Sequence, residues 1–311
     1  MKYLLMLAIL AIGPTGGRAA PADDKAEKQM MEDWATGETV CSCLLGKCAV
    51  FRGALLTDSP RSGSLVEVSV GEGMHGMPQG GRPVSVPYSS EINPKEPVES
   101  PGYAWRGAAL EKNAPLTVVL ALSRVGPVPA GSPLLVTGDE RTSGVIRDLT
   151  READRLEASP QSISDSVASL SRRVNPALAG FLYHYLLYRV SSQQLDLASS
   201  LLGRMIGNPG VPRSKWQWLA GVIVSCDVSL SDQGRASEIG RFVELSQDAD
   251  STTAAAGLYA LSRLAGFHPE LMSYLTPAVI SAVANSYRSL VSRGAIPHSS
   301  PLESALGIKG E

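Results

Sequence analysis

Hydrophobic positions along the chain follow two different periods, and the period changes near residue 140. Over residues 41–137, short β-branched and apolar runs stand between glycines and prolines. Such runs are typical of a small all-β unit, and their number favours a small barrel or sandwich. The expected strands lie within residues 49–56, 65–70, 83–88, 116–122 and 134–137.

In the second half of the chain, apolar residues recur every three or four positions, which predicts amphipathic helices. The first such segment carries Ile146, Leu149 and Leu156. Asn175 and Thr276 each precede a proline, so both are candidate N-caps with proline in the first turn. The expected helices are residues 144–157, 163–172, 176–190, 194–206, 214–228, 234–246, 251–265, 268–274 and 277–293.

Alternate helices of this series begin about 37 to 40 residues apart, near the period of HEAT and armadillo repeats. The repeated segments share almost no sequence identity, so the helical unit is either HEAT-like or irregular. The chain as a whole is predicted to be an α+β protein of two domains. A small barrel-like all-β domain at 41–137 precedes an all-α domain at 144–293, and residues 294–311 form a polar tail.

The N-terminus has the pattern of a secretory signal. Lys2 is followed by an apolar run over residues 3–12 and then by small residues, which predicts cleavage after residue 19. The run is about half the length that a membrane span needs, so we expect no stable membrane anchor after cleavage. The sequence therefore predicts a secreted or periplasmic protein in which residues 20–40 form a polar leader, either solvated or folded as one short surface helix.

Composition and charge narrow the range of partners. Hydrophobic residues make up 44% of the chain and charged residues 19%, which is typical of a globular protein. The formal net charge is −2, and loss of Lys2 and Arg18 with the signal makes it −4. No basic cluster is present to meet a phosphate backbone, so we expect no nucleic-acid partner.

The cysteines are expected to meet an oxidising compartment. Cys41, Cys43 and Cys48 are clustered, which predicts one local disulfide and leaves the third thiol free or paired with Cys226. Pairing of Cys48 with either Cys41 or Cys43 is sterically easier than pairing of Cys41 with Cys43. Cys226 lies in an apolar helical pattern and is interpreted as a buried structural thiol.

One loop could bind a metal. Met74, His75 and Met77 offer thioether and imidazole ligands that suit Cu(I), and the clustered cysteines could add thiolates. The alternative interpretation is a mobile loop whose methionines cover apolar surface. Copper is therefore the one cofactor that the sequence suggests.

No enzymatic motif supports a catalytic assignment. A Gly-x-Gly-x-x-Gly pattern at residues 71–76 precedes prolines and glycines, so the helix that a dinucleotide site needs cannot begin there. Neither a Gly-x-Ser-x-Gly elbow nor a His-Glu-x-x-His zinc motif occurs. None of the four histidines has a sequence neighbour that would activate it, so we assign no catalytic residue and expect no enzyme.

The segment around the cysteine cluster resembles the netrin/tissue-inhibitor-of-metalloproteinase module. The resemblance lies in Cys41-Ser42-Cys43, in Phe51 with Gly53, and in the run 65–70. It implies that residues 41–137 form an OB-type barrel used for protein contact rather than catalysis. The protease-inhibiting mechanism of that family does not carry over, because Cys41 lies well beyond the expected new N-terminus.

Two hypotheses of function follow from these patterns. The first is an exported, non-enzymatic protein-binding or scaffold protein whose partner is unknown. The second is an exported copper-binding protein that uses Met74, His75, Met77 and the cysteine cluster.

Overall fold

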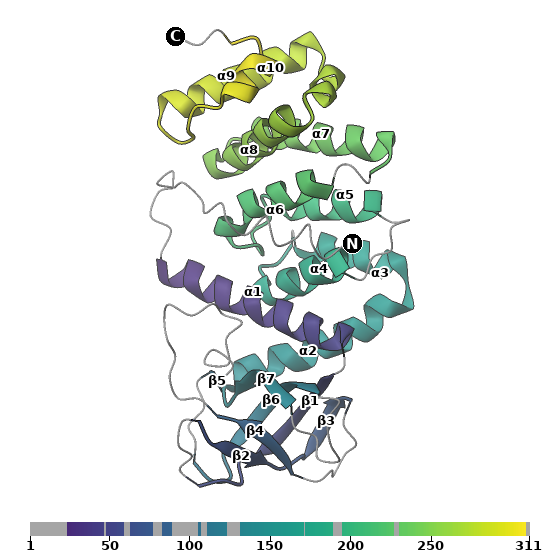
Figure 1. The fold of residues 1–311 in the computed structure, drawn as a ribbon, viewed down its shortest axis with the longest axis vertical. Helices are drawn as coiled ribbons and strands as arrows, with labels where there is room; N and C mark the ends of the chain where they lie inside the picture. The colour runs from purple at the N-terminus through teal and green to yellow at the C-terminus, as the bar shows by residue number, and fades with distance from the viewer. Residues whose placement is uncertain are drawn as a thin grey trace.

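The computed structural model has a small β region at one end and helices stacked above it along the long axis (Figure 1). This arrangement confirms the predicted α+β class, with strands before most of the helices. The predicted signal at residues 1–19 lies outside the described part of the chain. The structure describes residues 24–46, 48–58, 63–76, 83–88, 105–106, 111–122, 131–170, 172–188, 195–226 and 230–308.

The strands form an open sheet and a ribbon, so the expected closed barrel is wrong. Five strands pair in the order β3-β1-β6-β7-β5, and β2 pairs with β4. Within the described residues, the ribbon of β2 and β4 lies over one face of the sheet, and its apolar side chains share a core with that face. The ribbon does not join the two edges of the sheet, so the strands do not close into a barrel. The strands are β1 (Cys48–Ala54), β2 (Leu65–Val68), β3 (Glu72–His75), β4 (Val84–Pro87), β5 (Trp105–Arg106), β6 (Pro115–Leu122) and β7 (Gly131–Thr137).

Both faces of the central sheet are buried, each against a different layer. Val50 of β1 lies opposite Val119 of β6, and both belong to the core shared with the helices. Their chain neighbours Phe51 and Val118 also pair, and these two belong to the core beneath the ribbon. Alternation of side chains along a strand produces this division. The sheet and the helices therefore share one continuous core.

The helices from residue 140 onward follow the predicted series to within a few residues. Successive pairs, α3 with α4, α5 with α6 and α7 with α8, are stacked away from the sheet (Figure 1). The predicted caps are present, since Asn175 accepts a bond from the Leu178 N–H and Thr276 from the Val279 N–H. The helices are α1 (Asp24–Leu45), α2 (Glu140–Ala158), α3 (Pro160–Leu170), α4 (Pro176–Tyr188), α5 (Leu195–Met205), α6 (Arg213–Cys226), α7 (Asp232–Ser246), α8 (Ser251–Phe267), the 3₁₀ helix η5 (Pro269–Tyr274), α9 (Pro277–Ser292) and α10 (Ser300–Ala305).

Helix α1 revises the predicted leader at residues 20–40 and the predicted start of the β domain at residue 41. It is one continuous helix that passes through the first two clustered cysteines and crosses α4 (Figure 1). Trp34, Val40 and Cys41 are fully buried on it and belong to the helical core. The exposed face of α1 is filled by charged residues, and its buried face has few large apolar side chains. The sequence pattern alone therefore indicates a solvated segment.

Two glycines allow α1 and α4 to cross with their backbones in contact. A Cβ on Gly37 would lie within 3.0 Å of the Ala177 carbonyl oxygen. A Cβ on Gly180 would likewise lie within 3.0 Å of the Trp34 carbonyl oxygen. Real Cβ atoms do not approach that closely, so the crossing requires glycine at both positions.

Polar contacts hold α1 to two further helices. The Glu27 carboxylate accepts bonds from the Ser214 N–H at 3.1 Å and the Ser214 hydroxyl at 2.8 Å, at the N-terminus of α6. A negative group is favourable at that end of a helix. The Arg141 guanidinium of α2 donates to both Asp33 oxygens, at 3.2 and 2.5 Å. Helix α1 thus contacts α2, α4 and α6 rather than solvent alone.

The predicted polar tail at residues 294–311 also needs correction. Helix α10 buries Leu302, and Leu306 just after it is buried as well. Ser299 caps the helix, with its hydroxyl accepting from the Leu302 N–H at 3.5 Å. Two leucines among many polar residues are too sparse a signal to predict a helix this short, and its packing against α8 determines it.

His184 of α4 makes stability depend on pH. The side chain is half-buried beside Tyr188, and burial lowers its pKa to about 4. The unfolded chain therefore takes up a proton below its ordinary pKa of about 6.5 before the folded protein does. We expect the free energy of unfolding to fall by about 1 kcal/mol between pH 7 and pH 5 on this account, allowing for partial exposure.

Urea denaturation at the two pH values measures this loss. The variant His184→Gln should show a smaller difference between pH 7 and pH 5 than the wild type. Gly240→Ala, which changes an exposed position of α7 and no titrating group, is the control and should leave the difference unchanged. An unchanged difference in His184→Gln would contradict the assignment.

Candidate binding pocket

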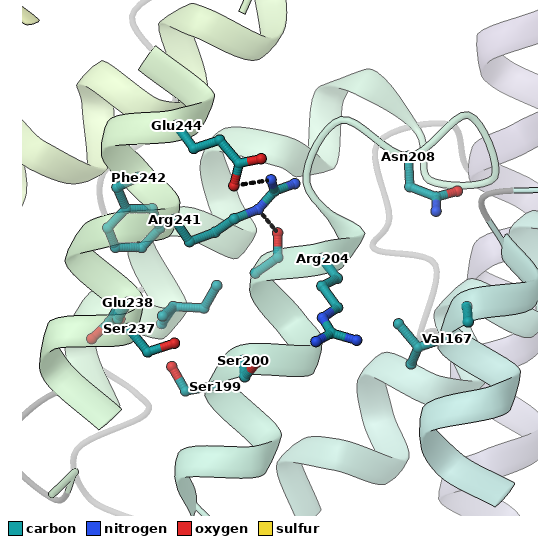
Figure 2. A pocket seen from close by; sticks show the side chains of 13 residues that line it. Val167, Ser199, Ser200, Arg204, Asn208, Ser237, Glu238, Arg241, Phe242 and Glu244 are labelled. Carbon is teal, nitrogen blue, oxygen red and sulfur yellow. Dashed lines mark hydrogen bonds and ion pairs between the residues drawn. The ribbon is translucent and has the colours of Figure 1, made fainter. Parts of the chain in front are cut away.

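Helices α5 and α7 lie side by side and are joined near both ends. At one end, the Asp196 carboxylate accepts from the Ser231 N–H at 3.1 Å and from the Ser231 hydroxyl, and these bonds lower the pKa of Asp196. At the other end, Arg241 donates to the Gly203 carbonyl at 3.3 Å and pairs with Glu244 at 2.8 Å (Figure 2). These contacts fix the spacing of the two helices between the joined ends.

A cavity of about 580 Å³ lies between these ends. Ser199, Ser200 and Gly203 of α5 and Ser237 of α7 line it, together with apolar residues of α3 and α6 and with charged side chains of α5 and α7. The small α5 residues lie on one face because residues three and four apart are neighbours on a helix. Larger side chains there would fill the space, so the cavity depends on this run of small residues.

Two polar groups in the cavity have no partner among the residues that the structure describes. Ser199 is only 7% exposed, and its hydroxyl makes no hydrogen bond. Arg204, in the last turn of α5, engages in no ion pair or hydrogen bond within the same part of the chain. A buried hydroxyl without a partner is uncommon in native structures. The Ser199 hydroxyl is screened from solvent, whereas Arg204 is exposed, so of these two groups the Arg204 cation is the one that a ligand can reach.

Of the predicted disulfide candidates, the structure joins Cys43 to Cys48, with a Cα–Cα distance of 5.4 Å. The bond links the end of α1 to the start of β1 and confirms the expected involvement of Cys48. Cys41 keeps a buried thiol, and burial raises its pKa well above the ordinary value. The side chain of Cys226 lies outside the described part of the chain.

The predicted copper ligands are brought together only in part. Met74 is half-buried against the helical core, whereas the adjacent His75 is exposed on β3. Met77 lies outside the described residues. Cys43 and Cys48 have no thiolate to offer while they are bonded to each other, and the described chain holds no group of three or more His, Cys, Asp or Glu residues with metal-site geometry. Copper binding stays a prediction without an assembled donor set.

The histidines lie on four separate parts of the fold. His298 has a charged partner, since its Nδ1 lies 2.9 Å from the Glu303 carboxylate, which also accepts from the Tyr287 hydroxyl at 2.8 Å. These bonds lower the pKa of Glu303. The cluster joins α10 to α9 and accounts for the position of the terminal helix.

The sequence by itself does not single out the pocket residues. The available signal is a run of serines and a glycine, Ser199, Ser200 and Gly203, in an otherwise apolar helix. Such a run is equally compatible with close helix packing, so only the positions of α3 and α7 distinguish a cavity from a contact.

Within the described helices, we find no stretch with the length and apolarity to span a lipid bilayer. No protein-family model, no curated protein and no solved structure matches this chain.

Proposed function

We propose that the protein is an exported, non-enzymatic binding protein that holds a segment of a partner protein in the pocket between α3, α5 and α7. The observation that carries the proposal is the preformed cavity between these helices, which is lined mostly by polar and charged side chains and in which Ser199 and Arg204 lack partners among the described residues. Ligand sites are concave and hold a few polar groups that can orient a ligand. The predicted signal and the Cys43–Cys48 disulfide support export, because disulfides persist in oxidising compartments.

The helical stack supports a protein partner over a small metabolite. Stacked helix pairs present extended surfaces beside each pocket, and proteins of this kind commonly bind other proteins, an argument by analogy. The resemblance of residues 41–137 to a module used for protein contact points the same way. The contacts at both ends of α5 and α7 keep the pocket open before a partner arrives, which reduces the entropy lost on binding.

Site-specific photo-crosslinking in the native cell tests the proposal. A photoreactive phenylalanine analogue replaces Ser237, which lies at the pocket, or Arg288, an exposed residue of α9. We expect a discrete adduct with one polypeptide from position 237 and none from position 288. Identical adducts from both positions, or no adduct from position 237, would contradict partner binding in the pocket.

A further inference from the structure

The last helix is held in place by the surface beneath it. Helix α10 has six residues and lies at the end of the stack away from the sheet (Figure 1). A helix this short is not stable by itself in water. Leu302 within it and Leu306 just after it are buried, and residues four apart share one face of a helix. Amphipathic peptides anchor in the grooves of other proteins through leucines with this spacing.

Polar contacts add to the two leucines. The Glu303 carboxylate accepts from the Tyr287 hydroxyl of α9 at 2.8 Å, and the Ser299 N–H donates to that hydroxyl at 2.7 Å. The Ser299 hydroxyl also bonds to that of Ser262 on α8 at 2.5 Å. The surface beneath α10, which we call the α10 seat, is formed by Ser262 and Ala265 of α8, Met272 of η5 and Tyr287 of α9.

Helix α10 fills its seat incompletely. Pro269 of η5 is exposed, and Ala265 and Met272 each keep 7% of their surface exposed while α10 is docked. A larger apolar side chain in place of Ala305 would cover this surface, and covering apolar surface favours binding. The chain's own segment is therefore not the tightest possible occupant. The unfilled space is a cavity of about 410 Å³, lined by Ala265, Pro269, Met272, Ser273, Pro301, Ser304 and Ala305.

We propose that residues 298–308 form a releasable strap, and that the vacated α10 seat binds a helical segment of a partner protein. The partner segment carries two leucines four residues apart, a carboxylate directly after the first, and a large apolar residue where the strap has Ala305. The strap and the partner compete for one seat, so the strap inhibits binding. The seat is separate from the pocket between α3, α5 and α7, and the proposal does not depend on that pocket.

Fluorescence anisotropy with the full exported chain tests the proposal. The probe is a labelled peptide of residues 297–308, acetylated and amidated, that carries Ala305→Leu. We expect this peptide to bind, and the same peptide with Leu302→Ala and Leu306→Ala added to show no binding. The peptide that keeps Ala305 should bind about tenfold more weakly, because it leaves the cavity unfilled.

Variants of the protein change the fraction of molecules in which the strap is open. Leu302→Ala in the protein weakens the strap and should tighten peptide binding by about tenfold or more, because the apparent affinity scales with the open fraction. Ala305→Leu in the protein strengthens the strap and should weaken peptide binding. Ser300→Ala, at an exposed position of α10, is the matched control and should bind as the wild type does.

The proposal is overturned if no peptide binds even to the Leu302→Ala protein, or if the peptide without the two leucines binds equally well. Unchanged peptide binding by the Ala305→Leu protein would also overturn it, and this variant keeps the test decisive where Leu302→Ala lowers the melting temperature. A dimer that forms with rising concentration and is abolished by Leu302→Ala would assign the seat to a second copy and overturn the partner.

Discussion

Replacing Gly180 by alanine is expected to lower the free energy of unfolding by about 3 kcal/mol, the upper range for overpacking. In an exposed helix the same change would stabilise by up to ~1 kcal/mol, since alanine is the better helix former. Here the new Cβ would lie within 3.0 Å of the Trp34 carbonyl oxygen, an atom of the α1 backbone that no rotamer change can move. Helices α1 and α4 must separate to accept it. Gly37→Ala should have a similar effect, because its Cβ meets the Ala177 carbonyl.

Urea denaturation compares these variants with Gly240→Ala. Gly240 lies in α7, and a Cβ added there would have no described atom within 4 Å beyond its own helix, so that variant should be at least as stable as the wild type. If Gly180→Ala is as stable as Gly240→Ala, the backbone contact between α1 and α4 does not exist.

The second large effect is expected on removing α1 and the sheet. The change of hydrophobic period near residue 140 suggests that residues 144–311 form an independent unit. The structure gives the opposite expectation, because Trp34 and Val40 of α1 and Val50 and Val119 of the sheet belong to the helical core. Each large side chain contributes about 1.5–3 kcal/mol by burial, and a domain has only about 5–15 kcal/mol of net stability.

We therefore expect the fragment 144–311 to lose its cooperative thermal transition and to bind a hydrophobic dye. Loss of α1 also exposes the site where the Lys215 ammonium lies 5.7 Å from the Trp34 ring centroid and 4.6 Å from that of Trp218. The control is the fragment 24–308, which keeps every described residue and should melt cooperatively. A sharp helical melt of 144–311, followed by circular dichroism, would restore the predicted division into two independent domains.

The periodic parts of the fold could be predicted from the sequence. Helices α2 to α9 have large apolar residues at helical spacing and capping residues such as Thr276, and both signals are local. Strands β1 and β6 could also be predicted from a local signal. Both of their faces are buried, so each contains a continuous apolar run. The predicted export signal and the expectation of a disulfide at Cys48 also needed only neighbouring residues.

Other elements depend on residues far apart in the chain. Strand β3 lies where the sequence predicts a loop, because its residues have little strand propensity and its pairing with β1 determines its conformation. Helix α1 buries few large side chains, and its close approach to α4 depends on glycines at positions 37 and 180 that meet only in the folded protein.

The pocket, too, depends partly on local sequence and partly on the positions of distant helices. Ser199, Ser200 and Gly203 lie on one segment of sequence, which by itself determines that they share part of a helix surface. Whether that surface is packed, exposed or opposite a cavity depends on where α3 and α7 lie. Contacts such as Asp196 with Ser231, 35 residues apart, determine that spacing. The sequence by itself thus determined helices α2 to α9, their caps and their order. The open sheet, the helices α1 and α10 and the cavity followed from packing between distant segments, because burial depends on which faces meet.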